Sequence, residues 1–148
     1  AAGQYAISRG SGNADNEAGD FTATATLTAD FGANNEGGTI EGTLEGFMAD
    51  GQSKNWKVGL MKASIHTDGS FIKPGSDENA SPLIRSETTW TIGTEKDDPN
   101  GYWHGGLYQE NTLDRPNLPE SVAGHFEARY ENTHRMRGAF GADEDPAN

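Results

Sequence analysis

The chain contains no cysteine, which excludes disulfides, thiolate metal ligands and a cysteine nucleophile. Apolar residues are also scarce: they make up 32% of the 148 residues, and no run approaches the roughly 18 apolar residues of a membrane span. Positive charge is scarce too, because 11 Lys and Arg stand against 23 Asp and Glu, for a net charge of −12. So acidic a chain repels nucleic acid and anionic lipid. We therefore expect no nucleic-acid partner and no membrane span.

Glycine is the residue type that the chain has in abundance, with 20 copies. A chain with this much glycine and this little apolar content is either disordered or a β protein rich in turns. Its length suits a single domain with its own core. The opening AAGQYAISRG lacks the basic and then apolar pattern of a signal peptide, so we expect a mature or trimmed soluble domain.

Apolar and polar residues alternate with a period of two, which favours the β protein over the disordered chain. Over residues 21–31, Phe, Ala and Leu occupy one face and Thr and Asp the other, which is typical of a strand. Residues 40–48 repeat this pattern. There the alternation places Ile40, Gly42, Leu44, Gly46 and Met48 on the inner face and Phe47 on the outer face.

Similar alternation over 56–61, 85–93, 101–109, 121–130 and 133–142, with a short first strand near Tyr5, predicts about eight strands and no helix. Such a sheet removes its edges by closing, so we predict a single antiparallel up-and-down β-barrel. A two-sheet sandwich is the alternative. We divide the chain into an N-terminal segment over 1–19, a barrel over 20–142 and a flexible tail over 143–148.

The order of the strand motifs resembles that of the C-terminal β-barrel of transferrin-binding protein B and its relatives, which are bacterial surface lipoproteins and haemophores. The matching pieces are Leu27–Gly32, Gly38–Gly46, Trp56–Leu60, Tyr102–Tyr108, Val122–Ala128 and Gly138–Ala142. The resemblance implies an eight-stranded barrel with a filled interior, displayed outside the cell or on the bacterial outer surface. It also implies a partner such as transferrin, haemoglobin, haem or a complement factor. It carries over no functional residue.

The four histidines and three tryptophans are the residues most open to a ligand role. We expect His104 and His125 to face solvent, because they alternate with Trp103 and Phe126. A metal or haem site would need histidines to converge, with Met136 or Tyr108 as a further ligand. No metal-ligand spacing supports such a site, so we predict no metal and no cofactor. We expect Trp56, Trp90 and Trp103 to fill the interior rather than line a cavity.

The stretch 66–83 has two prolines and no clear period, so we read it as the longest loop. Its apolar pair, Phe71 and Ile72, supplies the candidate partner-binding residues, although both can equally tuck under the barrel rim. The acidic turns at 50–55 and 96–101 match no calcium motif and read as turn formers.

No residue spacing matches a catalytic motif, so we predict no enzymatic activity. The leading hypothesis is a non-enzymatic binding module, on a bacterial surface or secreted, that engages a host protein or a haem or iron ligand through its loops. The alternative is a structural subunit of an extracellular assembly, such as a surface layer or fibre, so self-assembly stays open. A small-molecule carrier with a hollow interior is a third possibility.

Overall fold

The computed structural model describes residues 1–7, 17–31, 38–66, 69–72, 86–108, 121–131 and 133–143. Within these ranges the chain is all β, as predicted, and no helix is long and apolar enough to cross a membrane. The strands are β1 (Ala2–Ile7), β2 (Glu17–Asp30), β3 (Thr39–Ala49), β4 (Gln52–Lys54), β5 (Trp56–Ile65), β6 (Ser70–Ile72), β7 (Thr88–Ile92), β8 (Glu95–Lys96), β9 (Gly101–Tyr108), β10 (Ser121–Tyr130) and β11 (His134–Asp143).

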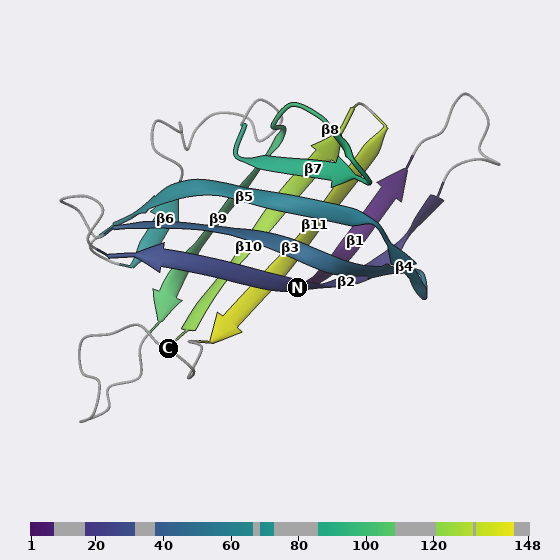
Figure 1. The fold of residues 1–148 in the computed structure, drawn as a ribbon. Helices are drawn as coiled ribbons and strands as arrows, with labels where there is room; N and C mark the ends of the chain where they lie inside the picture. The colour runs from purple at the N-terminus through teal and green to yellow at the C-terminus, as the bar shows by residue number, and fades with distance from the viewer. Residues whose placement is uncertain are drawn as a thin grey trace.

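Eight of the strands close into an antiparallel ring in the order β3, β2, β1, β11, β10, β9, β6, β5, and β5 pairs back onto β3. The prediction of a closed antiparallel sheet of eight strands is therefore confirmed. Three short strands lie outside the ring: β4 pairs with β3, β7 with β5, and β8 with β7. In Figure 1, β2, β3 and β5 cross in front of β1, β11, β10 and β9, so the ring has two facing walls.

The ring takes in residues on the N-terminal side of position 20. β1 pairs with both β2 and β11, and β2 already begins at Glu17. β11 extends to Asp143, and the remaining tail over 144–148 lies outside the described residues. The first strand is therefore a full member of the ring.

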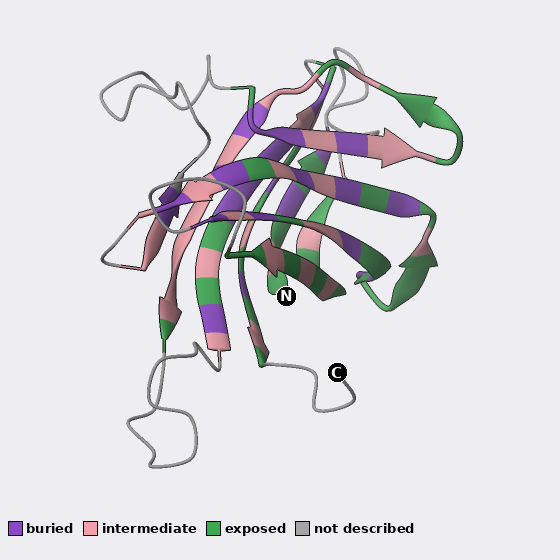
Figure 2. Cartoon of the chain, turned by 60° about the vertical axis from the view of Figure 1, so that its left-hand side comes forward, coloured by how far each residue is buried: buried purple, intermediate pink, exposed green. Residues whose placement is uncertain are grey.

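Side chains from both walls meet in the interior. Trp56, Trp90 and Trp103 are 7%, 0% and 0% exposed, so all three face inward as expected. Phe21 on β2 packs against Phe126 on β10, with 6.1 Å between ring centroids. Buried and exposed residues alternate along the ring strands in Figure 2. The aromatic side chains thus fill the space between the walls and join them.

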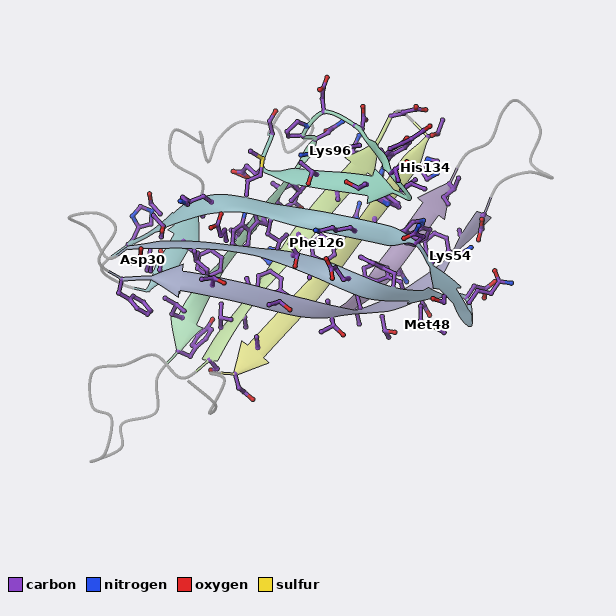
Figure 3. All side chains as sticks on the ribbon, in the orientation of Figure 1. Asp30, Met48, Lys54, Lys96, Phe126 and His134 are labelled. Atoms are coloured by element: carbon purple, nitrogen blue, oxygen red, sulfur yellow. The ribbon has the colours of Figure 1, made fainter. Side chains whose placement is uncertain are left out.

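The structure corrects the predicted faces of Phe47 and Met48. Phe47 is fully buried and Met48 is 43% exposed, the reverse of the simple alternation. Gly46 has a φ of +66° and the register with β2 shifts between Thr22 and Thr24, so a bulge inverts the faces beyond it. Figure 3 accordingly has Met48 on the outside of the sheet and Phe126 within the ring.

Two similar sequence segments, GHFEA over 124–128 and GAFGA over 138–142, lie on the neighbouring strands β10 and β11. In the paired register Gly124 lies opposite Phe140 and Phe126 lies opposite Gly138. A Cβ added at Gly124 would lie 2.7 Å from the Phe140 Cζ atom. Each strand therefore provides a glycine where its neighbour places a phenylalanine.

Closure between β5 and β9, which we call the seam, depends on short elements. β6 pairs with β9 through Ser70 and Phe71 only. Beyond it, the Trp103 indole nitrogen donates to the carbonyl of Met61 on β5 at 2.8 Å. The Thr88 hydroxyl on β7 donates to the carbonyl of Glu127 on β10 at 2.8 Å. The residues just before β7 bridge the same gap through the backbone, because the Met61 nitrogen donates to the Glu87 carbonyl at 3.0 Å and the Glu87 nitrogen to the Gly101 carbonyl at 3.0 Å. Backbone and side-chain hydrogen bonds together thus complete the wall where the ladder is short.

Candidate functional site

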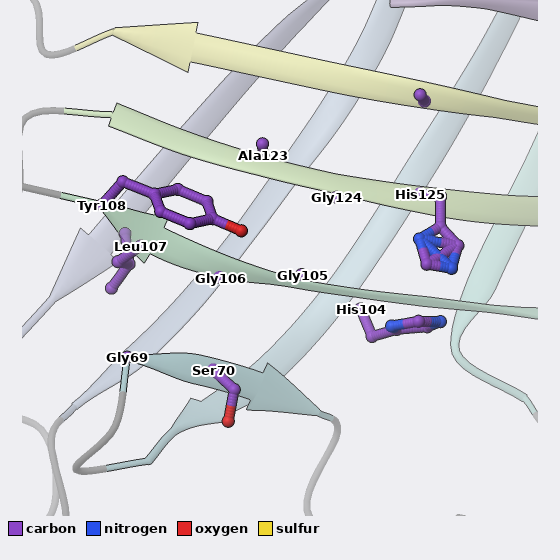
Figure 4. Close-up of a pocket in the computed structure, with 11 residues that line it drawn as sticks. Gly69, Ser70, His104, Gly105, Gly106, Leu107, Tyr108, Ala123, Gly124 and His125 are labelled. Carbon is purple, nitrogen blue, oxygen red and sulfur yellow. The ribbon is translucent and has the colours of Figure 1, made fainter.

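A groove of about 470 Å³ runs over the outer face of β9 and β10 (Figure 4). Its lining residues are Gly69, Ser70, His104, Gly105, Gly106, Leu107, Tyr108, Ala123, Gly124, His125 and Ala139. Glycine and alanine form the floor, because they are the smallest side chains on these strands. The larger polar side chains stand at its ends. The groove is therefore shallow, and its chemistry comes from a few residues.

The two groove histidines lie side by side. His104 and His125 are directly opposed in the β9–β10 register, and their ring centroids are 3.8 Å apart with an interplanar angle of 66°. Tyr102 stacks on His104 with 5.9 Å between centroids and an angle of 20°. The expected outward direction of both histidines is confirmed by the structure. Their contact was not predicted, since it depends on which residues of β9 and β10 face each other.

Tyr108 stands at the other end of the groove and is 58% exposed. Its ring lies over Gly106, because a Cβ added at Gly106 would be 3.5 Å from the Tyr108 hydroxyl. In Figure 4 the Tyr108 ring and the His125 ring project from the same side of the sheet. An exposed aromatic ring that is held in a fixed position can pack against a partner protein.

Arginines gather on the outer face of β10 and β11, around the buried carboxylate of Glu127, which is 5% exposed. Glu127 Oε1 lies 3.0 Å from Arg129 Nη2 and 3.9 Å from Arg135 Nε. Arg137 is opposite Glu127 in the strand register. We call Arg129, Arg135 and Arg137 the arginine cluster. Two guanidinium groups share this carboxylate and the third lies on the strand opposite, so this part of an acidic molecule concentrates cationic side chains.

A second depression, of about 540 Å³, adjoins the arginine cluster over β1, β2 and β11. Its lining includes Arg135, Arg137, Gln4, Ala6 and Asp20. Small residues, Ala6, Ala18 and Gly19, form part of its lining, which carries the two guanidinium groups together with the carboxylate of Asp20. The arginine cluster therefore borders a hollow that a partner side chain can enter.

The two candidate partner-binding residues belong to β6, not to a loop. Phe71 is 1% exposed and packs on Trp103 with 5.0 Å between centroids, so its ring is tucked into the barrel, which was the alternative to a partner contact. Ile72 ends β6 and pairs with Ser64 of β5 through the backbone. Phe71 is drawn inward because β6 closes the seam. The rest of the expected loop, over 73–83, lies outside the described residues.

Other residues considered as ligands are engaged elsewhere. Met136 is 1% exposed in the core, so its sulfur is remote from the outer face that carries His104 and His125. His134 packs edge-on against Trp90 and Tyr130, at 5.5 and 5.3 Å between centroids. Among the described residues, no group of three or more His, Asp or Glu side chains forms a metal site.

The acidic turns within the described ranges have structural partners. Asp50 adopts a φ of +51° in the turn that joins β3 to β4. Asp97 accepts a hydrogen bond from the backbone nitrogen of Glu131 at 2.6 Å, which ties the β8–β9 connection to the β10–β11 turn. These carboxylates therefore serve turns, as expected for turn formers.

Fold and surface together define a closed antiparallel β-ring with a filled interior and a polar outer groove. Neither the known protein families, nor the curated proteins, nor the solved structures give a match to this chain.

Proposed function

We propose that the chain is a non-enzymatic binding module, displayed on a bacterial surface or secreted, with a barrel of the transferrin-binding protein B type. It engages a host protein or a haem or iron ligand. One observation carries the proposal: aromatic side chains occupy the interior, so the surfaces open to a partner lie on the outside of the ring. The outer face of β9, β10 and β11 is the part we assign to the partner.

The residue types on this face support the assignment. Tyrosine and arginine are enriched at protein interfaces and among the residues that dominate binding energy. Tyr108 is 58% exposed, and the side chain of Arg135 is 54% exposed. Both stand beside hollows floored by small residues. A partner with acidic groups and an apolar or aromatic side chain fits such a surface by charge and by shape.

Direct binding to the purified domain tests this proposal. Transferrin and haemoglobin are passed over the immobilised domain in surface plasmon resonance, and haem is titrated by absorbance. In the double variant Tyr108→Ala/Arg137→Ala, we expect affinity for the bound partner to fall about tenfold or more, as for interface residues that dominate binding. Weaker binding at high salt would accompany an arginine contact.

A matched variant on another wall is the control. Met48→Ala/Lys57→Ala also removes one exposed apolar side chain and one cation, from β3 and β5. It is expected to bind like the parent protein. Equal loss in both variants would remove the assignment to β9–β11, and no binding to any of the three ligands would argue against the proposal as a whole.

The alternative function is a structural subunit of an extracellular assembly. The observation in its favour is the outer face of β2, where Thr22, Thr24, Thr26 and Thr28 are all exposed. A flat row of threonines can pack against a second copy of the chain. Size-exclusion chromatography and negative-stain microscopy separate the two functions. Regular polymers without ligand binding would favour the subunit, and a monomer at high concentration would count against it.

A further inference from the structure

We propose that His104 and His125 form a binding site for a divalent transition metal ion of the Zn²⁺ type on the outer face of β9 and β10. The inference goes beyond the proposed partner-binding role and does not depend on it. It starts from the single place among the described residues where two imidazoles are in contact, at 3.8 Å between ring centroids.

The strand register places the two imidazoles side by side, within reach of one ion. Directly opposed residues of an antiparallel pair have Cβ atoms roughly 4.5–5.5 Å apart. His104 and His125 are such a pair, and both project to the outer face. Two nitrogens on one zinc lie no more than about 4 Å apart, since each Zn–N bond is roughly 2.0–2.1 Å. The ring centroids are 3.8 Å apart, so the two rings are in contact with each other, and a shared ion requires them to turn until one nitrogen of each points to it.

The surroundings leave room for the ion and for its remaining ligands. The floor beside the two rings is made of Gly105, Gly106 and Ala123, which have little or no side chain. Tyr102 stacks on His104 from the neighbouring position on the same face and limits its rotation. A zinc ion held by two imidazoles completes its tetrahedron with water or with a donor from a bound partner.

The donor set selects the metal. Imidazole nitrogen suits Zn²⁺, Cu²⁺ and Ni²⁺, whereas Ca²⁺ and Mg²⁺ require oxygen ligands. No Asp or Glu is among the groove residues that the structure describes. We therefore expect binding of Zn²⁺ and Cu²⁺, with Cu²⁺ the tighter of the two on the Irving–Williams order, and no competition from Ca²⁺ or Mg²⁺.

Isothermal titration of the purified chain with ZnCl₂ is the first test, repeated in excess CaCl₂ or MgCl₂. We expect one zinc ion per chain with unchanged affinity in either salt. His104→Asn and His125→Asn should each weaken it by more than the roughly 10–100-fold that loss of an outer-shell partner costs, because each removes a direct ligand. His134→Gln is the control, since His134 packs on Trp90 and Tyr130 away from the groove. Its affinity for zinc should equal that of the parent protein.

Histidine side-chain NMR on the unmodified protein gives a second readout that does not depend on variants that fold. Zinc should shift the ring nitrogen resonances of His104 and His125 together, and leave those of His134 in place. Absence of zinc uptake up to millimolar concentration would overturn the proposal. Uptake that survives both groove substitutions, or shifts confined to other histidines, would overturn it as well.

Discussion

At the scale of single residues, the match between glycine and phenylalanine on neighbouring strands decides how tightly the ring can pack. Gly124 and Gly138 face the interior, where the wall is crowded by rings from their own sheet and from β2. Glycine at these positions is required by volume: a methyl group would meet the carbonyl oxygen of a neighbouring strand, His104 or Ala2, as well as an aromatic ring. The alternation of glycine and phenylalanine in the sequence thus describes a packing arrangement.

Gly124→Ala tests that arrangement. The added Cβ would lie 2.7 Å from Phe140 Cζ, so we expect the free energy of unfolding to fall by about 1–3 kcal/mol, the usual cost of overpacking a core. Denaturant unfolding measures the change. Gly141→Ala is the control, because its nearest neighbour would be the Val122 carbonyl oxygen at 3.7 Å. Equal stability of the two variants would contradict the packing account.

The phenol of Tyr5 makes the free energy of unfolding depend on pH in the alkaline range. Burial raises the pKa of its phenol, and the hydrogen bond to Glu17 and the nearby charges of Glu17 and Asp50 raise it further. Above the unfolded pKa of about 10, the folded state holds the proton more tightly than the unfolded state does. The stabilisation is therefore complete below about pH 10 and is lost as the pH rises through the raised folded pKa.

Tyr5→Phe should remove this dependence. We expect the free energy of unfolding of the parent protein to fall more steeply above about pH 10 than that of the variant, so that the difference between them shrinks. Urea unfolding at a series of pH values from neutral to strongly alkaline measures it. Tyr108→Phe, at an exposed ring, serves as the comparison and should follow the parent curve. Parallel curves for the parent and Tyr5→Phe would refute the assignment.

At the scale of the elements, the seam is where the ring depends on individual hydrogen bonds. Thr88 is fully buried on β7, and its hydroxyl reaches the Glu127 carbonyl on β10. Thr88→Val keeps the shape and removes the donor, so it should destabilise the fold by about 1–3 kcal/mol. Thermal unfolding of this variant against Thr26→Val, on the exposed face of β2, isolates the seam. A change no larger than that of Thr26→Val would mean that the hydrogen bond is dispensable.

Some of these elements could be predicted from the sequence alone and others could not. Period-two alternation predicted seven of the eight ring strands and the inward tryptophans, because burial of one face imposes that period; the strand predicted around Trp90 is β7, outside the ring. It failed at Gly46, where a single residue with positive φ inverts the faces of Phe47 and Met48. It also missed β6, since three residues are too few to show a period. The contact of His104 with His125 required the strand register, which no local pattern contains.

At the scale of the whole molecule, charge is unevenly distributed. The chain carries a net charge of −12, yet the arginine cluster lies on one wall around a single buried carboxylate. The groove with its two histidines lies on the same wall. A field of this kind favours approach of an acidic partner to β9–β11 and repels it from the other surfaces. The proposed partner face and the proposed metal site therefore share one side of the ring.

The pairing of β1 with β11 has a consequence for how the molecule is made. Ala2 lies opposite Ala139, so the first strand has no partner on that side until β11 has been synthesised. Closure is thus a late step with a large loop to close, which slows folding. Until then the edges of β1 and β11 are open to pairing with other chains. The chain is therefore most exposed to aggregation during synthesis, before β1 and β11 have paired.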